Sequence, residues 1–210
     1  MKISAIIPAY NEESTIANVI KTVKEVSEIE QIIVVSDGST DRTVSVAKRL
    51  GVKVFEIKKN IGKGGAIKKG FEKTNSDILL FLDADLIGLK CEHIYALINP
   101  IKESLSDMTI GVFSQGRLLT DLPQLLMPYL SGQRAMKREI IDLIPDLDLL
   151  KYGLEIAITK TVKKHGYKAI QVKLINLTQR IKEEKYGLVE GTKKRLQMYL
   201  DIVKQLKFGS

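Results

Sequence analysis

The chain of 210 residues contains a single cysteine, Cys91, and no tryptophan. One cysteine cannot form an internal disulfide and does not provide the set of thiolate ligands that a zinc site needs. The start of the chain leads straight into a short apolar run and then into acidic residues, which is not typical of a signal peptide. We therefore expect a cytoplasmic protein in a reducing compartment.

Long hydrophobic runs and aromatic residues are also scarce. No stretch of 18 or more apolar residues occurs, so the sequence predicts no membrane-spanning helix. Aromatic residues make up 6% of the chain, which leaves few side chains to stack on nucleic-acid bases. The net charge of +8 still points to anionic partners. With nucleic acid disfavoured, phosphorylated small molecules and an acidic membrane surface remain.

The first half of the chain alternates apolar runs with stripes of helical spacing. Apolar runs predict strands at 3–7, 31–35, 52–57 and 77–82, and Pro8 is expected to stop the first of them. Helices are predicted after Ser14, which is a candidate cap, after Thr40, and over 63–73. This alternation predicts an α/β fold in which helices sandwich a mostly parallel, mixed sheet.

The second half is less regular, with an apolar stretch at 122–130 that two prolines interrupt. Strands are predicted at 108–113 and 168–177, and helices at 133–143, 154–164 and 191–207. The last helix is basic and amphipathic, so it either packs on its own domain or lies on an anionic membrane. No repeat or linker is evident, and we expect one domain over 1–210.

The most informative motif is Asp83-Ala84-Asp85, directly after the predicted strand 77–82. Open parallel sheets bind their ligands at the carboxyl ends of the strands. Hard divalent cations prefer carboxylate oxygens and are often shared with the phosphates of a substrate. The motif therefore favours a metal site that holds a phosphorylated substrate. A solvated loop with a helix cap is the alternative.

Polar clusters also follow the other predicted strands, at 9–12, 37–39 and 60–65. The glycine-rich turn 60–65 opens a helix, where backbone N–H groups favour phosphate, and Lys63 adds positive charge. Its spacing matches neither a P-loop nor a dinucleotide fingerprint, and a flexible basic loop is the alternative. Asp37 is placed to accept from a base or ribose, whereas Asp41 is expected to cap the next helix.

Four motifs occur in one order: IPAYNEE at 7–13, SDGSTD at 36–41, GKGGA at 62–66 and DAD at 83–85. Together they resemble the family 2-type glycosyltransferases of GT-A fold, and most of all the polyprenyl-phosphate sugar transferases and glucosyl-3-phosphoglycerate synthases. The resemblance implies transfer of a hexose from a nucleotide-diphosphate sugar to a phosphorylated small molecule or a lipid phosphate, with Mg²⁺ or Mn²⁺ as cofactor. Residues 1–115 would then bind the donor and 116–210 the acceptor.

The resemblance also implies roles for individual residues. Asp85 would bind the metal directly and act in catalysis, and Asp83 would face the ribose or the metal through water. Lys63 and Gly64 would approach the diphosphate. The remaining positions expected to line the nucleotide are Pro8, Ala9, Tyr10, Glu12, Asp37 and Ala84.

On the acceptor side, the segments 131–135 and 152–155 also resemble that subgroup. Glu155 is the candidate catalytic carboxylate near the acceptor hydroxyl, with helix capping as the alternative. Arg134 and Arg138 would lie four residues apart on one face of the predicted helix, where they are candidates to bind an acceptor phosphate. A solvated basic face is the alternative, and a retaining mechanism would need no base.

Two positions depart from the pattern of the subgroup. Ser36 stands where many relatives carry aspartate, and Gln179 stands at the apparent position of a metal-binding histidine. The two histidines, His93 and His165, are expected at the surface.

Two other functions remain as alternatives. One is a nucleotidyltransferase that makes nucleotide sugars, and the other is a non-catalytic module that binds nucleotide sugars or a membrane. Peripheral membrane contact and a homodimer are left open.

Overall fold

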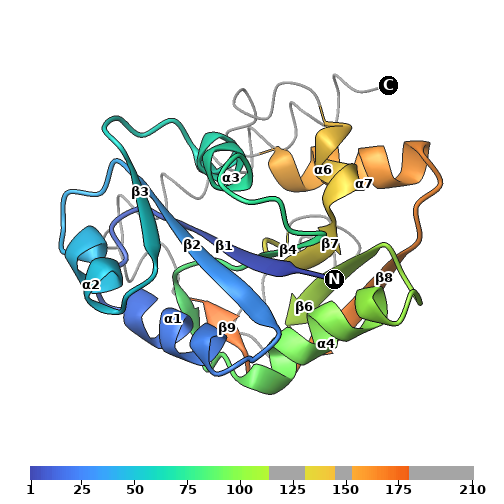
Figure 1. The fold of residues 1–210 in the computed structure, drawn as a ribbon, viewed down its shortest axis with the longest axis horizontal. Helices are drawn as coiled ribbons and strands as arrows, with labels where there is room; N and C mark the ends of the chain where they lie inside the picture. Colours follow the sequence, from blue (N-terminus) through green and yellow to red (C-terminus); the bar gives the residue numbers. More distant parts are fainter. Residues whose placement is uncertain (114–130, 145–152, 180–210) are drawn as a thin grey trace, which may run out of the picture.

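The computed structural model describes residues 1–113, 131–144 and 153–179 (Figure 1). Its main sheet has seven strands in the order β3-β2-β1-β4-β7-β6-β8. β7 runs antiparallel to both of its neighbours, whereas the other pairings in this sheet are parallel. The strands are β1 (Ile3–Ala9), β2 (Ile29–Asp37), β3 (Lys53–Ile57), β4 (Ile78–Phe81), β6 (Met108–Phe113), β7 (Arg134–Lys137) and β8 (Ala169–Leu174). The predicted mixed, mostly parallel sheet is confirmed.

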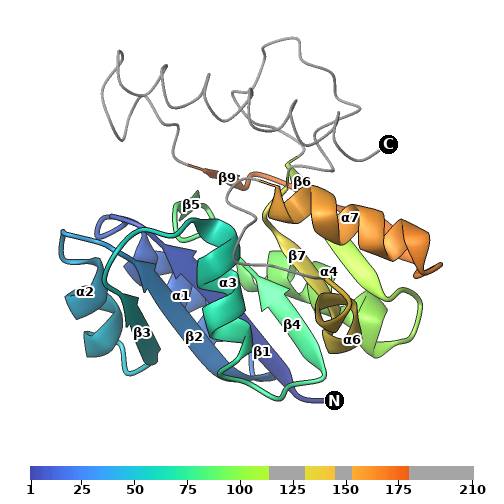
Figure 2. The ribbon, with the colours of Figure 1, turned by 90° about the horizontal axis from the view of Figure 1, so that it is seen from above.

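Helices cover both faces of the sheet (Figures 1 and 2). Side chains from α1, α2 and α4 belong to one buried cluster, and side chains from α3, α6 and α7 belong to the other. Within β1, Ile7 joins the first cluster and Ile6 the second, as the two-residue period of a strand requires. The helices are α1 (Ile16–Lys24), α2 (Thr43–Arg49), α3 (Lys63–Phe71), α4 (Cys91–Lys102), α6 (Arg138–Asp142) and α7 (Leu154–Lys164).

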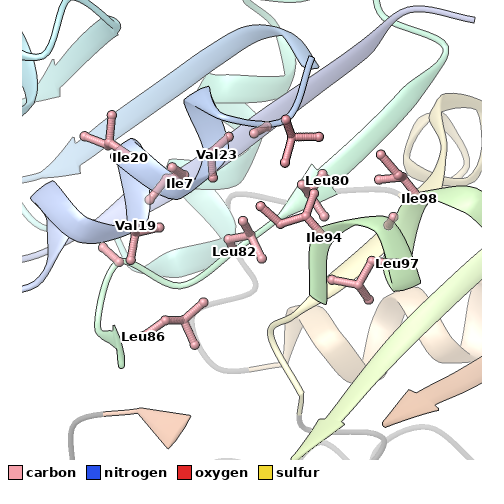
Figure 3. Packing of buried hydrophobic residues seen from close by; sticks show 14 of the residues in the cluster. Ile7, Val19, Ile20, Val23, Leu80, Leu82, Leu86, Ile94, Leu97 and Ile98 are labelled. Carbon is pink, nitrogen blue, oxygen red and sulfur yellow. The ribbon is translucent and has the colours of Figure 1, made fainter. Parts of the chain in front are cut away.

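The first cluster is shown in Figure 3, where apolar side chains of α1 and α4 pack on β1 and β4. Ile7, Leu80 and Leu82 from the strand region are all fully buried beneath them. The register of the two strands pairs Ile6 with Phe81, so the segments that follow β1 and β4 leave the sheet beside each other. Close packing in this layer therefore determines how the polar residues at that edge are placed.

The first strand does not stop at Pro8, as the sequence had suggested, because Pro8 pairs with Val35 and β1 continues to Ala9. The carbonyl of Ile6 accepts from the N–H of Leu82, so the backbone of Pro8, two residues on, faces the same side. The pairing with β4 ends before that point, at Phe81. A missing N–H therefore breaks no bond of that ladder.

The predicted helix 133–143 was wrong in its first half. Residues Arg134–Lys137 form β7, inserted between β4 and β6, and the helix α6 begins at Arg138. A short apolar run fits a buried strand or a helix equally well, and here strand pairing on both sides decides. Helix α1 likewise begins at Ile16, with Thr15 and not Ser14 in the cap position.

The strand at 108–113 and the helix at 154–164 agree with the sequence analysis, whereas the predicted strand 168–177 is β8 followed by a turn. A second small sheet pairs β5 (Leu86–Ile87) with β9 (Thr178–Gln179) in antiparallel fashion. The segments 122–130 and 191–207 lie outside the described residues. None of the helices within the described ranges has the length and hydrophobicity that crossing a bilayer requires.

Candidate active site

The polar clusters predicted at the strand ends do meet at one edge of the sheet. β2, β1 and β4 are neighbours, and their parallel strands all end at this edge. The N–H of Asn11 donates to Oγ of Ser39 at 3.1 Å, and the N–H of Thr40 donates to Oδ1 of Asn11 at 2.8 Å. The loops that follow β1 and β2 are thus joined directly.

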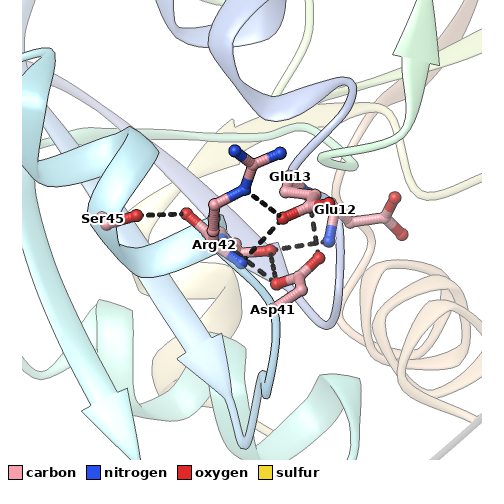
Figure 4. Close-up of polar contacts among 6 residues, drawn as sticks. Glu12, Glu13, Asp41, Arg42 and Ser45 are labelled. Carbon is pink, nitrogen blue, oxygen red and sulfur yellow. Dashed lines mark hydrogen bonds and ion pairs between the residues drawn. The ribbon is translucent and has the colours of Figure 1, made fainter.

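A second set of contacts between these loops surrounds Asp41 (Figure 4). Its Oδ1 accepts from the N–H of Thr43, the first residue of α2, at 2.9 Å, but Arg42 and not Asp41 occupies the cap position of that helix, so the expected cap at Asp41 was wrong by one residue. Its Oδ2 accepts from the N–H of Glu13 at 3.1 Å. These bonds hold the turn that carries Tyr10 and the buried Glu12.

Asp37, at the end of β2, positions the glycine-rich loop. Its two carboxylate oxygens accept from the N–H groups of Ile61 and Gly62, each at 2.8 Å. Burial raises the pKa of Asp37, and the two amide hydrogen bonds oppose that rise. Gly38 has a φ of +76°, and a Cβ there would lie 2.8 Å from the backbone N of Asn60. The loop is therefore held in place before α3 begins, and the predicted contact of Asp37 with a base stays a prediction.

Lys63 is the centre of the site, because its ammonium joins the two halves of the chain. Its Nζ lies 2.6 Å from Oδ1 of Asp83 and 2.8 Å from Oε1 of Glu155. Lys63 opens α3, Asp83 follows β4, and Glu155 lies in the first turn of α7. Burial acts to lower the pKa of Lys63, but the two carboxylates outweigh it and raise the pKa above its ordinary value. Lys63 is therefore a fixed positive charge.

Asp83 is held on its other side by Gln133, a residue that the sequence analysis had not singled out. Nε2 of Gln133 donates to Oδ2 of Asp83 at 2.7 Å, and the N–H of Asp83 donates to Oε1 of Gln133 at 3.0 Å. Gln133 is fully buried. The sequence did offer one indication that Gln133 is functional, because it lies in the segment 131–135, which resembles an acceptor-side motif.

The chemistry of the acidic pair suits a hard divalent cation. Asp85 lies between β4 and β5, half-buried, and its Oδ1 is enclosed by protein. Mg²⁺ and its analogues typically take one or two protein carboxylates and complete their shell with water and substrate phosphates. In the ranges that the structure describes, no group of three or more histidine, cysteine, aspartate or glutamate residues could hold a metal.

Several predicted nucleotide contacts have restricted access. Ala9 and Ala84 are 3% exposed, and both belong to the first buried cluster, so it is their backbone that faces the edge. Gly64 is also buried, in the first turn of α3. Pro8 and Tyr10 are half-buried at the end of β1. Contact of these residues with a nucleotide stays a prediction.

Arg134 does not lie on a helix, so its expected pairing with Arg138 on one helix face was wrong. Its side chain is buried between β7 and α7, where Nε donates to the carbonyl of Ser131 at 2.8 Å and Nη1 donates to Oγ1 of Thr159 at 2.9 Å. Burial lowers the pKa of Arg134 to about 10 against the opposing influence of Glu155. Arg134 thus fixes α7 and keeps a positive charge near Glu155.

Arg138 lies at the opposite edge of the sheet from the acidic pair. Its backbone N–H donates to the carbonyl of Asp77, just before β4, whereas Asp83 follows the other end of that strand. Its guanidinium lies 4.1 Å from the ring centroid of Phe71 and donates to the carbonyl of Thr74. The structure therefore does not bring Arg138 to the site.

The two histidines differ from each other. His165 is exposed after the last turn of α7, as expected. His93 is 4% exposed, so its expected surface position was wrong. The ring is enclosed because α4 packs beside the turn that follows β8, with Nε2 of His93 2.9 Å from the carbonyl oxygen of Ile175.

Gly132 offers a test of how closely the charged cluster is packed. A Cβ at this position would lie 2.5 Å from Oδ2 of Asp83 and closer still to Nζ of Lys63. Gly132→Ala is therefore expected to displace both side chains and lower kcat/KM by about a hundredfold, since small misplacements at a reacting centre cost that much. Steady-state kinetics would check this, with thermal unfolding showing that the fold is retained. Unchanged kinetics would mean that the geometry of the cluster is irrelevant to activity.

Comparison with known proteins places this geometry in a family. The model of glycosyl transferase family 2 matches residues 4–153. Glucosyl-3-phosphoglycerate synthase from Mycobacterium tuberculosis is 30% identical over 194 residues, which cover 74% of this chain and 59% of that protein. Dolichyl-phosphate beta-glucosyltransferase from Drosophila melanogaster is 40% identical over 101 residues, covering 40% of this chain and 31% of that protein. The chain thus spans about 59% of the length of the synthase.

Solved structures agree with these matches. A crystal structure of the M. tuberculosis synthase with Mn²⁺, uridine diphosphate and glucosyl-3-phosphoglycerate has a TM-score of 0.81 at 26% identity, covering 98% of this chain and 78% of that one. Another, with Mn²⁺, UDP-glucose and glycerol 3-phosphate, has a TM-score of 0.80 at 25% identity, covering 98% and 78%. The resemblance and the GT-A fold expected from the sequence are confirmed, and the chain belongs to glycosyl transferase family 2.

Proposed function

We propose that this protein is a metal-dependent glycosyltransferase that moves a hexose from a nucleotide-diphosphate sugar to a phosphorylated acceptor. The observation that carries the proposal is the ammonium of Lys63 between Asp83, beside the donor-side loops, and Glu155, on the acceptor-side helix α7. A uridine diphosphate sugar is the donor we favour, since complexes of the mycobacterial synthase contain UDP-glucose. A phosphorylated small molecule or a lipid phosphate is the acceptor, in keeping with relatives of both kinds.

The acidic pair would hold the cofactor. Asp85 would bind a Mg²⁺ or Mn²⁺ ion directly and Asp83 would do so through water, because both oxygens of Asp83 already contact Lys63 and Gln133. When bound, such an ion neutralises charge on the diphosphate that leaves. The fit of two carboxylates to a hard cation supports this assignment, as does the Mn²⁺ in complexes of the synthase.

The residues around the pair would bind and orient the donor. The N–H groups at the start of α3, near Gly64, and the ammonium of Lys63 supply positive potential that is already in place when charge develops on the leaving group. Asp37 keeps that loop in position through Ile61 and Gly62. The half-buried Pro8 and Tyr10, the buried Glu12 and the backbone of Ala9 and Ala84 would line the nucleotide.

Glu155 would face the acceptor. Its carboxylate has a cation on one side, Lys63, and it lies near the buried guanidinium of Arg134. A carboxylate at this place can accept a hydrogen bond or a proton from an acceptor hydroxyl, and the positive charges of Lys63 and Arg134 would help to orient it. We assign Arg134 this positioning role in place of acceptor binding. Cytoplasmic location, peripheral membrane contact and a homodimer stay predictions.

The proposal is tested by binding and turnover. UDP-, GDP- and dTDP-sugars are screened by thermal shift with and without Mn²⁺, since a ligand at a hundred times its Kd stabilises the native state by about 2.7 kcal/mol. Donors that bind are then incubated with 3-phosphoglycerate, glycerol 3-phosphate and a polyprenyl phosphate, and transfer is followed by mass spectrometry. Transfer to any of these supports the proposal. Release of pyrophosphate from a nucleoside triphosphate and a sugar phosphate would overturn it, as would donor binding without turnover.

A further inference from the structure

His93 is a buried imidazole that has no part in the proposed chemistry, yet both of its ring nitrogens are engaged. Nδ1 accepts from the backbone N–H of Lys90 at 3.1 Å, just before α4 begins. Nε2 lies 2.9 Å from the carbonyl oxygen of Ile175. A carbonyl can only accept, so the proton is on Nε2 and the neutral ring donates to Ile175 while accepting from Lys90. His93 therefore links the start of α4 to the turn after β8.

That turn leads to β9, which pairs with β5, the short strand that directly follows the acidic pair. β9 pairs with β5 in a register that sets Gln179 opposite Leu86, the residue that follows Asp85. The pairing is two residues long on each strand, and so short a ladder is marginal by itself. It therefore depends on contacts outside the ladder to hold β9 in place.

The turn is held at two points besides the ladder. One is the bond from His93 to Ile175. The other is a close approach of the turn to Gly88, just after β5, which has a φ of +81° and where a Cβ would lie 2.8 Å from the carbonyl oxygen of Asn176, so only glycine leaves room for the turn here. Leu177, between this turn and β9, is fully buried in the first cluster. The path from His93 to the backbone beside Asp85 is thus continuous.

We infer that His93 is a positioning residue of the donor site, whose Nε2–H bond to the carbonyl of Ile175 holds β9 against β5 and so places Gln179 beside Asp85. The inference rests on the proposed function for its consequence, which is the affinity for metal and nucleotide. Its structural part, the anchoring of β9, stands on the geometry of His93 alone. A side chain that cannot donate at this position leaves the Ile175 carbonyl without that bond.

Two conservative variants separate the two bonds of the ring. His93→Gln carries an amide NH₂ that reaches the position of Nε2 and keeps the donor to Ile175. His93→Asn carries an oxygen near the position of Nδ1, so it keeps the acceptor for Lys90 but is too short to reach Ile175. His165→Asn, at the exposed histidine after α7, is the matched control.

Two quantities are measured on the full chain. Mn²⁺ affinity in the presence of UDP is followed by electron paramagnetic resonance, and hydrogen exchange is followed in peptides that span 175–179. His93→Asn is expected to weaken Mn²⁺ binding about tenfold, a loss equal to one hydrogen bond of about 1.4 kcal/mol, and to speed exchange in 175–179. His93→Gln and the control are expected to match the wild type.

The outcomes that would overturn the inference are distinct from those that bear on the proposed function. If His93→Asn binds Mn²⁺ as tightly as the wild type and exchanges at the same rate in 175–179, the inference is overturned. It is also overturned if His93→Asn and His93→Gln lose the same Mn²⁺ affinity while exchange in 175–179 does not change. Gly88→Ala, which crowds the carbonyl of Asn176 in the same turn, gives a second route should His93→Asn not fold, and wild-type affinity in that variant would also count against the inference. A wild-type protein that binds no Mn²⁺ with UDP would overturn the proposed function, and exchange alone would then decide the anchoring role.

Discussion

Asp85→Asn should lower the rate of sugar transfer by about a thousandfold, which corresponds to about 4 kcal/mol of lost transition-state stabilisation. The substitution keeps the size of the side chain and removes the charge that would hold the cation directly. Because Asp85 is half-buried and asparagine has nearly the same shape, the free energy of unfolding should change by about 1 kcal/mol or less. Transfer rates with Mn²⁺, together with urea unfolding, would measure the two effects separately.

Asp142→Asn is the matched control for this experiment, since it makes the same substitution at an exposed carboxylate on α6. It should transfer sugar at the wild-type rate. Asp85→Asn should also lose the stabilisation that Mn²⁺ and UDP confer on the wild type in thermal unfolding. Wild-type transfer by Asp85→Asn after treatment with a chelator would contradict the metal-dependent mechanism at its centre.

Lys63→Gln should have the second largest effect, because one ammonium neutralises two carboxylates that come from different halves of the chain. Its removal leaves Asp83 and Glu155 close to each other without their shared cation. We expect kcat/KM to fall by about a hundredfold to a thousandfold, the range found when one preorganised charge stabiliser is deleted. We also expect the free energy of unfolding to fall by about 2 kcal/mol, as for the loss of hydrogen bonds to charged groups.

The pH dependence of this variant follows from the direction of the pKa shift. The pKa of Lys63 is raised in the folded protein, so its contribution to stability is fully present below the ordinary lysine pKa of about 10.4 and is lost as the pH rises through the raised value. The difference in unfolding free energy between wild type and Lys63→Gln should therefore be constant from about pH 7 to pH 9.

Lys69→Gln provides the control for Lys63→Gln, because it makes the same change on the same helix at an exposed position. Its kinetics and its unfolding should match those of the wild type within error. If Lys63→Gln were as active as Lys69→Gln, the ion pairs that Lys63 forms with Asp83 and Glu155 would not contribute to the reaction.

Local patterns in the sequence were enough to locate the edge of the sheet where the polar loops meet. Each polar cluster there follows a strand whose apolar run is short, continuous and bounded by polar residues, and β1, β2 and β4 are all such runs. In a parallel sheet these strands must end at one edge, so Asp37 and Asp83 could be placed together without coordinates. The order of motifs then sufficed to identify the family.

Long-range contacts were needed for the rest of the site. The partners of Asp83 are Lys63 and Gln133, and the ammonium of Lys63 also reaches Glu155, more than 90 residues away in the chain. Local sequence periodicity does not predict these contacts, because they depend on how α3, β7 and α7 pack around the end of β4. The burial of His93 was missed for the same reason, since the turn that covers it follows β8, far along the chain.

The sequence by itself determined the α/β architecture, the edge of the sheet where the polar loops meet and the acidic pair at that edge, because local apolar periods and strand ends carry this information. The tertiary structure alone decided that 134–137 is a strand, that Arg138 lies at the far edge and that one ammonium neutralises two distant carboxylates. These outcomes depend on strand pairing and on the burial of charge. Both are properties of the assembled fold, and no single segment of the chain contains them.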